Sequence, residues 1–177
     1  MMDLIYAIKN GLMPGYQNIK HNLLGSPTLS VGCINGGIAV NIIPDRCSIE
    51  VDRRLLPGET NDSARKEILE LINKLKEKNK ILDIDISDPT AETIPMDTDI
   101  NEKVVKTSME SCKKILGKSE MKGVNFGCDA SSFTGAGIPS IVLGPGDSLQ
   151  AHTENEFVDL REVYQAAEIY SQISFDF

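Results

Sequence analysis

TLSVGCINGGIAVNIIPDRCSIEVDRRL, residues 28–55, is the stretch that decides the fold of the first half of this chain. Apolar residues alternate with small or polar ones over residues 28–35, which predicts a strand. Gly36-Gly37 is typical of a hairpin turn, and residues 38–43 resume the strand pattern before Pro44 breaks it. Residues 47–55 alternate again, so we expect a sheet with one buried face and one polar face.

Two neighbouring arginines at the end of the last strand fall on opposite faces of this sheet. Arg54 continues the polar face formed by Ser48, Glu50 and Asp52. Arg53 has the parity of the buried face, and we expect its guanidinium to escape to water at the strand end.

Helices are expected on one side of this sheet. Residues 2–13 predict a short helix that ends around Pro14, and a helix capped by Thr60 or Asn61 repeats apolar residues at helical spacing (Ile68, Leu71, Ile72, Leu75). Residues 81–87 alternate and predict a further strand. The sum is α/β: a two-layer α/β sandwich, ferredoxin-like but without its first strand.

A polar segment with two prolines follows and indicates a domain boundary, giving domains over residues 1–89 and 90–177. In the second domain, the sequence predicts a helix ending at Gly117, a strand over 124–126, and a helix from Asp129 to Ala136. An apolar strand over 138–143 and a last helix follow, the helix with a capping box from Asp159 to Glu162. Two strands make a poor sheet, so this half is expected to be a piece of a larger α/β layer.

Composition excludes several classes of function. Eighteen basic and 26 acidic residues give a net charge of −8, and the basic residues are scattered, so no nucleic-acid partner is expected. No apolar run reaches the roughly 20 residues of a membrane span, and the N-terminus lacks a signal-peptide pattern. Four widely spaced cysteines indicate reduced thiols and a cytoplasmic protein.

One loop has the composition of a site. Gly144-Pro145-Gly146 exposes backbone N–H groups where a carboxylate could bind, and His152 follows in a polar segment. His152 is either a zinc ligand or a surface histidine. Cys128 is either a nucleophile at a helix start or an incidental cysteine, and His21 is expected in a solvent-facing loop. No second ligand motif, such as His-x-Asp or a Glu-Glu pair, occurs in the chain.

Five motifs, in order, resemble the M20 metallopeptidases of the acetylornithine deacetylase and succinyl-diaminopimelate desuccinylase type. The resemblance runs from about residue 4 to residue 173 and covers the C-terminal part of such an enzyme. The motifs are Gly36-Gly37-x-x-x-Asn41-x-Ile43-Pro44-Asp45, Asp52-Arg53-Arg54 with Pro57-Gly58, Gly127-Cys128-Asp129-Ala130, Gly144-Pro145-Gly146, and Ala151-His152-Thr153-Glu154-Asn155-Glu156.

The resemblance implies a fold, a reaction and site residues. Residues 1–89 would be the lid or dimerisation domain, and 90–177 the closing segment of a three-layer zinc-hydrolase domain. Family members form homodimers and use two zinc ions to hydrolyse N-acyl amino acids or small peptides. His152 would bind zinc and Asn41 and Arg54 would hold the substrate. Asp129, Gly144, Pro145 and Gly146 would line the pocket.

The chain also departs from the family pattern. The general-base glutamate and most metal ligands belong to the family's N-terminal half and have no counterpart here, so no catalytic residue is assigned. We therefore expect the chain alone to be inactive and to bind zinc weakly or not at all. The alternative is a stand-alone ACT-like α/β module that binds a small molecule or dimerises. Such a module would not need the loop that carries His152.

Overall fold

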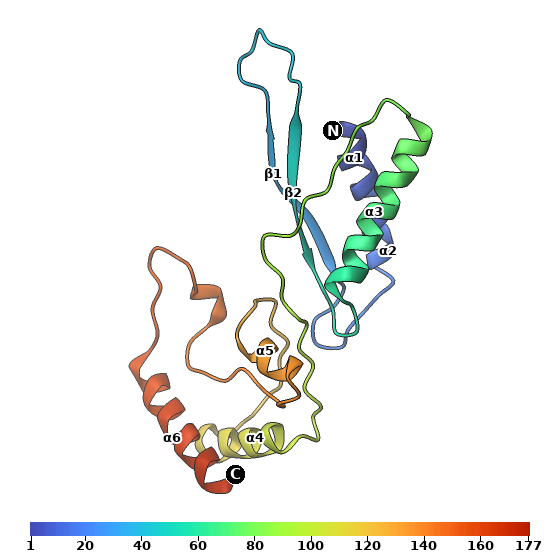
Figure 1. The fold of residues 1–177 in the computed structure, drawn as a ribbon. Coiled ribbons are helices and arrows are strands. Elements are labelled where there is room, and N and C mark those ends of the chain that lie inside the picture. Colours follow the sequence, from blue (N-terminus) through green and yellow to red (C-terminus); the bar gives the residue numbers. More distant parts are fainter. The chain divides into compact units, whose positions relative to one another are not determined.

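The structure is a computed structural model that describes all residues from Met1 to Phe177. The chain forms two compact units (Figure 1). Unit 1 comprises Met1–Pro95 together with Gly123–Gly127, and unit 2 comprises Met96–Lys122 and Cys128–Phe177. None of the helices combines the length and the apolar character that crossing a membrane requires.

Unit 1 is built on an antiparallel hairpin of β1 (Thr28–Gly36) and β2 (Cys47–Arg54). The ladder runs from the pair Thr28–Arg54 at one end to the pair Gly36–Cys47 at the other, with a bulge between Val31 and Cys33. Helix α3 (Asn61–Lys78) lies beside the hairpin, with α1 (Met2–Ala7) next to it (Figure 1). The two-layer α/β arrangement expected from the sequence is therefore confirmed.

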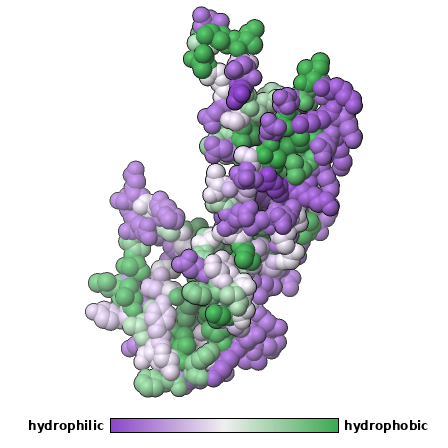
Figure 2. All heavy atoms as spheres, in the orientation of Figure 1, coloured by the Kyte–Doolittle hydropathy of each residue, from purple (hydrophilic) through white to green (hydrophobic).

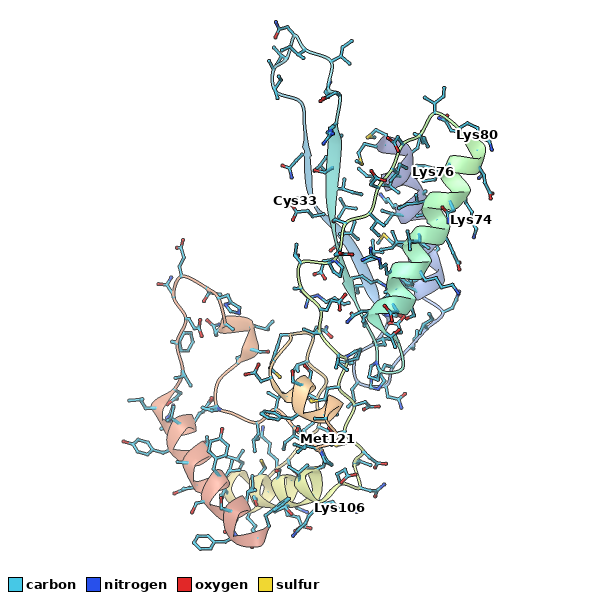
Figure 3. The ribbon with its side chains drawn as sticks, in the orientation of Figure 1. Cys33, Lys74, Lys76, Lys80, Lys106 and Met121 are labelled. Carbon is cyan, nitrogen blue, oxygen red and sulfur yellow. The ribbon has the colours of Figure 1, made fainter.

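The core of unit 1 lies between these two layers. Leu29 of β1 and Ile72 of α3 are buried together with Leu4, Ile8 and Tyr16 of the N-terminal helices. Alternate strand residues and the apolar stripe of α3 pack around them, which confirms the predicted strand parity and helix period (Val31, Ile49, Val51, Ile68, Leu71, Leu75). The C-terminal part of α3 carries Lys74 and Lys76, and Cys33 is exposed on β1 (Figure 3).

The sequence predicted that the N-terminal helix ends around Pro14, but in the structure it runs on to Tyr16. A π-helical turn η1 (Ile8–Leu12) follows α1 and leads into α2 (Met13–Tyr16). Pro14 lies at the start of α2, directly after the π-helical turn, and its fixed φ is compatible with helical backbone. The helix therefore continues for another turn and delivers Tyr16 to the core.

Two strands expected in unit 1 do not form. Residues 37–46 are a loop, because the ladder closes at Gly36–Cys47, and Ile38, Val40 and Ile43 are 87%, 109% and 92% exposed. Figure 2 shows apolar side chains gathered at the tip of this hairpin. Residues 81–87 have no strand partner either, although Ile84 and Ile86 pack against the core. Both segments have the side-chain pattern of a strand, but no neighbouring backbone pairs with them.

Unit 2 is mainly helical. Helices α4 (Lys103–Leu116) and α6 (Leu160–Asp176) pack against each other, with Val105, Ser111 and Ile169 among their buried residues. Helix α4 ends as predicted, at Gly117 in the left-handed conformation with φ of 74°. Two short helices, α5 (Ala130–Gly135) and η2 (Ser148–Gln150), lie between α4 and α6 in the sequence.

The strands predicted over residues 124–126 and 138–143 also fail to form. Residues 138–143 run without helix or strand structure, and side chains from other parts of the chain bind two of their carbonyl oxygens. The Thr98 hydroxyl donates to Ser140 O at 2.5 Å, and the Tyr170 hydroxyl donates to Leu143 O at 2.9 Å. The apolar sequence is that of a central strand, and the chain offers no second strand to pair with it.

Candidate functional site

Arg54 lies at the end of β2 with its guanidinium exposed. Its Nε donates to Asp52 Oδ2 at 2.9 Å, and its Nη2 lies 2.9 Å from the same oxygen. The side chain of Arg54 is 57% exposed and that of Asp52 is 52% exposed. An ion pair this open to solvent contributes on the order of 0–1 kcal/mol, so a ligand carboxylate can displace Asp52 at little cost.

Asn41 is exposed in the loop at the other end of the hairpin. Arg54 belongs to the terminal pair Thr28–Arg54, whereas Asn41 lies beyond the opposite terminal pair, Gly36–Cys47. A ladder of this length separates the two by roughly 24 Å at about 3.4 Å per residue. The structure therefore does not bring Asn41 and Arg54 to one small ligand within a single chain.

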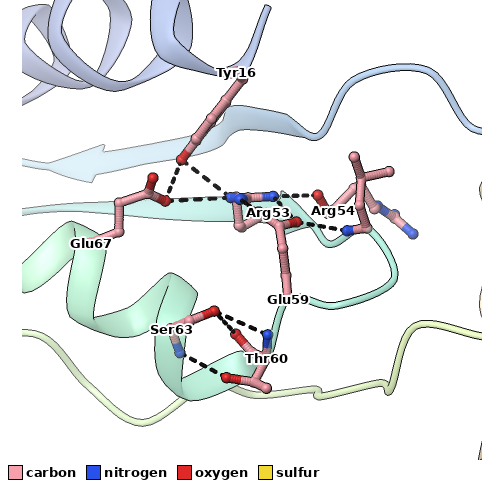
Figure 4. Close-up of polar contacts among 8 residues, drawn as sticks. Tyr16, Arg53, Arg54, Glu59, Thr60, Ser63 and Glu67 are labelled. Atoms are coloured by element: carbon pink, nitrogen blue, oxygen red, sulfur yellow. Dashed lines mark hydrogen bonds and ion pairs between the residues drawn. The ribbon is translucent and has the colours of Figure 1, made fainter. Parts of the chain in front are cut away.

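Arg53 is buried, and the expectation that it escapes to water is wrong. Only 8% of its side chain is exposed. Its Nη2 lies 2.5 Å from Glu59 Oε1, and its Nε donates to the Tyr16 hydroxyl at 3.1 Å (Figure 4). Its guanidinium carbon also stacks over the Tyr16 ring, 4.4 Å from the centroid. Tyr16 of α2 and Glu59 of the loop after β2 keep this cation out of water, and the strand pattern did not identify these partners.

Tyr16 completes a group of buried and half-buried polar side chains. Its hydroxyl donates to Glu67 Oε2 of α3 at 2.7 Å while accepting from Arg53. Burial, together with the hydrogen bond to Glu67, raises the pKa of Tyr16 from 10.0 to about 12. The four side chains Tyr16, Arg53, Glu59 and Glu67, hereafter the Arg53 cluster, link α2, β2 and α3.

The raised pKa of Tyr16 makes stability depend on pH in the alkaline range. Because the folded protein holds this proton more tightly than the unfolded chain, the stabilisation is complete below pH 10 and is lost as the pH rises through 12. Urea denaturation between pH 8 and pH 12 is expected to show this loss. Tyr16→Phe should lack the Tyr16 component of the decline, and Tyr6→Phe, at an exposed position, should retain it. Equal declines in both variants would contradict the assignment.

His152 lies in the exposed loop that precedes α6, in an unusual backbone conformation. Its φ is 63°, and no other residue except glycine has a positive φ. The backbone N–H of His152 donates to Glu156 Oε2 at 3.0 Å, which holds the turn. No group of three or more His, Cys, Asp and Glu side chains gathers anywhere in the chain, so its residues do not fit a two-zinc centre.

The Gly144–Gly146 turn already binds a carboxylate from its own chain. The Gly146 N–H donates to Glu162 Oε2 at 2.8 Å. The predicted capping box at α6 is therefore wrong: Asp159 caps the helix by accepting from Arg161 N at 2.9 Å, but Glu162 turns to Gly146 instead. Gly146 has φ of 89°, a conformation that favours glycine.

A pocket of about 440 Å³ lies behind this turn, within unit 2. The turn forms one wall, and α4 and α6 supply an apolar lining with a few polar groups (Cys112, Ile115, Leu116, Lys118, Leu143, Glu162, Gln165, Ala166, Ile169, Tyr170). Sequence reasoning missed this pocket, although the apolar stripes of the two helices were visible. Asp129 is not among its lining residues; it is exposed at the start of α5, and its side chain makes no capping bond.

The fold is one found in solved peptidase structures. An M20 family metallo-carboxypeptidase, Sso-CP2 from Sulfolobus solfataricus, superposes with a TM-score of 0.61 at 22% identity, covering 97% of this chain and 41% of that one. Aminopeptidase PepT from Bacillus cereus superposes with a TM-score of 0.62 at 21% identity over 85% of this chain and 39% of that one. These likenesses establish a peptidase-type α/β fold.

Sequence comparison identifies the family. Residues 1–80 match the peptidase dimerisation domain of the M20 family. Acetylornithine deacetylases from Photorhabdus laumondii and Pectobacterium carotovorum are 30% and 31% identical, each over 96% of this chain. These matches support a partial M20 fragment, as the motifs indicated. The chain spans about two fifths (42%) of the length of these curated relatives.

Proposed function

We propose that this chain supplies the lid and the closing catalytic segment of a zinc-dependent M20 amidohydrolase that acts on N-acyl amino acids. The lid is residues 1–89, and the catalytic segment is residues 90–177. The proposal is carried by the similarity to acetylornithine deacetylases, which extends over 96% of the chain and so includes both units. That extent also weighs against a stand-alone ACT-like module, which would need only the first unit.

The exposed polar groups suit an N-acyl amino acid. The Arg54 guanidinium offers a planar fork to the ligand carboxylate, and the Asn41 amide can both donate to and accept from an acyl group. The Gly144-Pro145-Gly146 turn and Asp129 would line the pocket, and His152 would be a zinc ligand. The cytoplasmic location belongs to the same proposal and rests on the cysteine usage.

Turnover by these 177 residues alone is not expected, because no group of three or more potential metal ligands gathers in the chain and no general base is assigned in it. Isothermal titration with ZnCl₂ should show no tight stoichiometric binding, and the purified chain should not hydrolyse N-acetyl-L-ornithine. Adding a polypeptide with the remaining three fifths of a related acetylornithine deacetylase should restore hydrolysis, and His152→Ala should abolish the restored activity. Tight zinc binding or turnover by the chain alone would refute the proposal.

The dimerisation domain suggests a homodimer, and the hairpin geometry gives that dimer a role. Asn41 and Arg54 lie at opposite ends of the hairpin, so one small substrate can contact both only if Asn41 comes from a second copy. Both strand edges of the two-stranded sheet are also free to pair. Light scattering after size-exclusion chromatography is expected to give a dimer mass, and a monomer at micromolar concentration would contradict the expectation.

A further inference from the structure

The ion pair between Arg53 and Glu59 also binds two backbone groups just after the end of β2, the Arg54 carbonyl and the Leu56 N–H. Arg53 Nη1 donates to the Arg54 carbonyl oxygen at 2.5 Å. The Leu56 N–H donates to Glu59 Oε2 at 2.6 Å. Arg53 and Glu59 are themselves joined at 2.5 Å, so the two side chains close a ring around residues 54–56 (Figure 4).

This clamp acts where the sheet no longer restrains the chain. Thr28–Arg54 is the last pair of the ladder, and Leu55 and Leu56 have no partner strand. Strand ends fray unless other groups bind their backbone. The clamp itself is anchored in the protein, because the guanidinium of Arg53 stacks over the buried Tyr16 ring.

The two adjacent arginines therefore differ in what they can do. Arg53 is 8% exposed and has its donors directed at protein groups, whereas Arg54 is 57% exposed and pairs with a solvated carboxylate on its own strand. The only other hydrogen bond of the Arg54 guanidinium runs from Nη1 to Asn125 O and is long, at 3.5 Å. Arg54 is therefore available to a ligand, and its backbone is held by Arg53 and Glu59. Fixed backbone geometry matters for ligand binding, because a shift of about 1 Å in a positioning group can cost on the order of 100-fold in function.

We propose that Arg53 and Glu59 are positioning residues that set the geometry of Arg54 for binding the carboxylate of the ligand. The proposal rests on the proposed function in one respect, namely that Arg54 binds this carboxylate. It assigns a role to the buried arginine and its partner glutamate that the family motifs leave open.

The test uses Arg53→Lys in the full chain, with Arg65→Lys as the matched control. A lysine keeps the positive charge near Glu59 but lacks the planar fork that spans Glu59 and the Arg54 carbonyl. Arg65 pairs with Asp88, whose side chain is 93% exposed, and has no part in the clamp. Glu59→Gln is a second variant that keeps the volume and an acceptor for Leu56. Circular dichroism establishes that each variant is folded.

Two NMR readouts separate positioning from a structural role. The first is hydrogen exchange at the Leu56 amide, and the second is the shift of the Arg54 Nε–Hε signal during titration with N-acetyl-L-ornithine. Arg53→Lys is expected to speed exchange at Leu56 and to weaken the apparent affinity about tenfold, because the fixed geometry is lost. Glu59→Gln should act in the same direction, and Arg65→Lys should change neither readout.

The possible outcomes distinguish a failure of the positioning role of Arg53 and Glu59 from a failure of carboxylate binding by Arg54. If the wild type binds and both clamp variants bind and exchange like it, positioning is overturned while the carboxylate role of Arg54 stands. If the wild type gives no ligand-induced shift at Arg54, that role fails, and the positioning claim fails with it. Faster exchange together with weaker binding in a folded clamp variant supports the proposal.

Discussion

Replacing Arg53 with methionine is expected to lower the free energy of unfolding by about 3 kcal/mol, the low end of the range for breaking a buried ion pair. The change removes the cationic partner of Glu59 and the Nε–H group that donates to the Tyr16 hydroxyl. Glu59 and Glu67 are 21% and 34% exposed, so water can partly solvate the freed carboxylates, which is why the low end applies. Urea denaturation at pH 7, followed by far-UV circular dichroism, measures the change.

Arg65→Met is the control for this prediction. Arg65 pairs with the exposed Asp88, so its loss should cost less than about 0.5 kcal/mol. The double variant Arg53→Met with Glu59→Gln should recover part of the loss, because no unpaired charge is left at Glu59. If Arg53→Met is as stable as Arg65→Met, the Arg53 cluster does not stabilise the fold.

Arg53 shows which structural features a local sequence pattern can predict and which it cannot. Strand alternation assigned Arg53 to the buried face, and that assignment is confirmed. The same pattern could not show its partners, because Tyr16 lies 37 residues before it in the sequence and Glu59 lies in the loop after β2. A cation at a buried position is itself a signal, since burial requires a partner. That signal pointed to a nearby acidic residue, not to escape into water.

The missing strands have a different cause. Segments 38–43, 81–87 and 138–143 have the apolar side-chain pattern that is typical of strands. A strand, however, exists only through hydrogen bonds to another strand, and the single ladder of this chain joins β1 to β2. Ile84 and Ile86 still reach the core without a ladder, so burial was predictable and pairing was not.

The site residues show the same division. The sequence placed Arg54 on a polar face and His152 in a loop, and the structure has both there. The contact between Glu162 and Gly146 joins residues 16 apart in the sequence. It was not predicted, because the local pattern assigned Glu162 to a capping box with Asp159. The separation of Asn41 from Arg54 followed from the hairpin itself, because a loop residue and the last strand residue lie at opposite ends of one ladder.

Ile8→Ala is expected to destabilise the chain by about 3 kcal/mol, within the range for removing a large aliphatic side chain from a core. Ile8 is 2% exposed and contributes to the cluster formed with Leu4, Tyr16, Leu29 and Ile72.

Ile8 also begins the π turn that precedes α2, so its neighbours are fixed by the helix on one side and the sheet on the other and can close the cavity only in part. Ile38→Ala, at a position 87% exposed, should change stability by less than about 0.5 kcal/mol. Thermal and urea unfolding of the two variants in parallel measures the difference. Equal stabilities would mean that the N-terminal helices do not belong to the cooperative core, and the pH dependence assigned to Tyr16 would then fail as well.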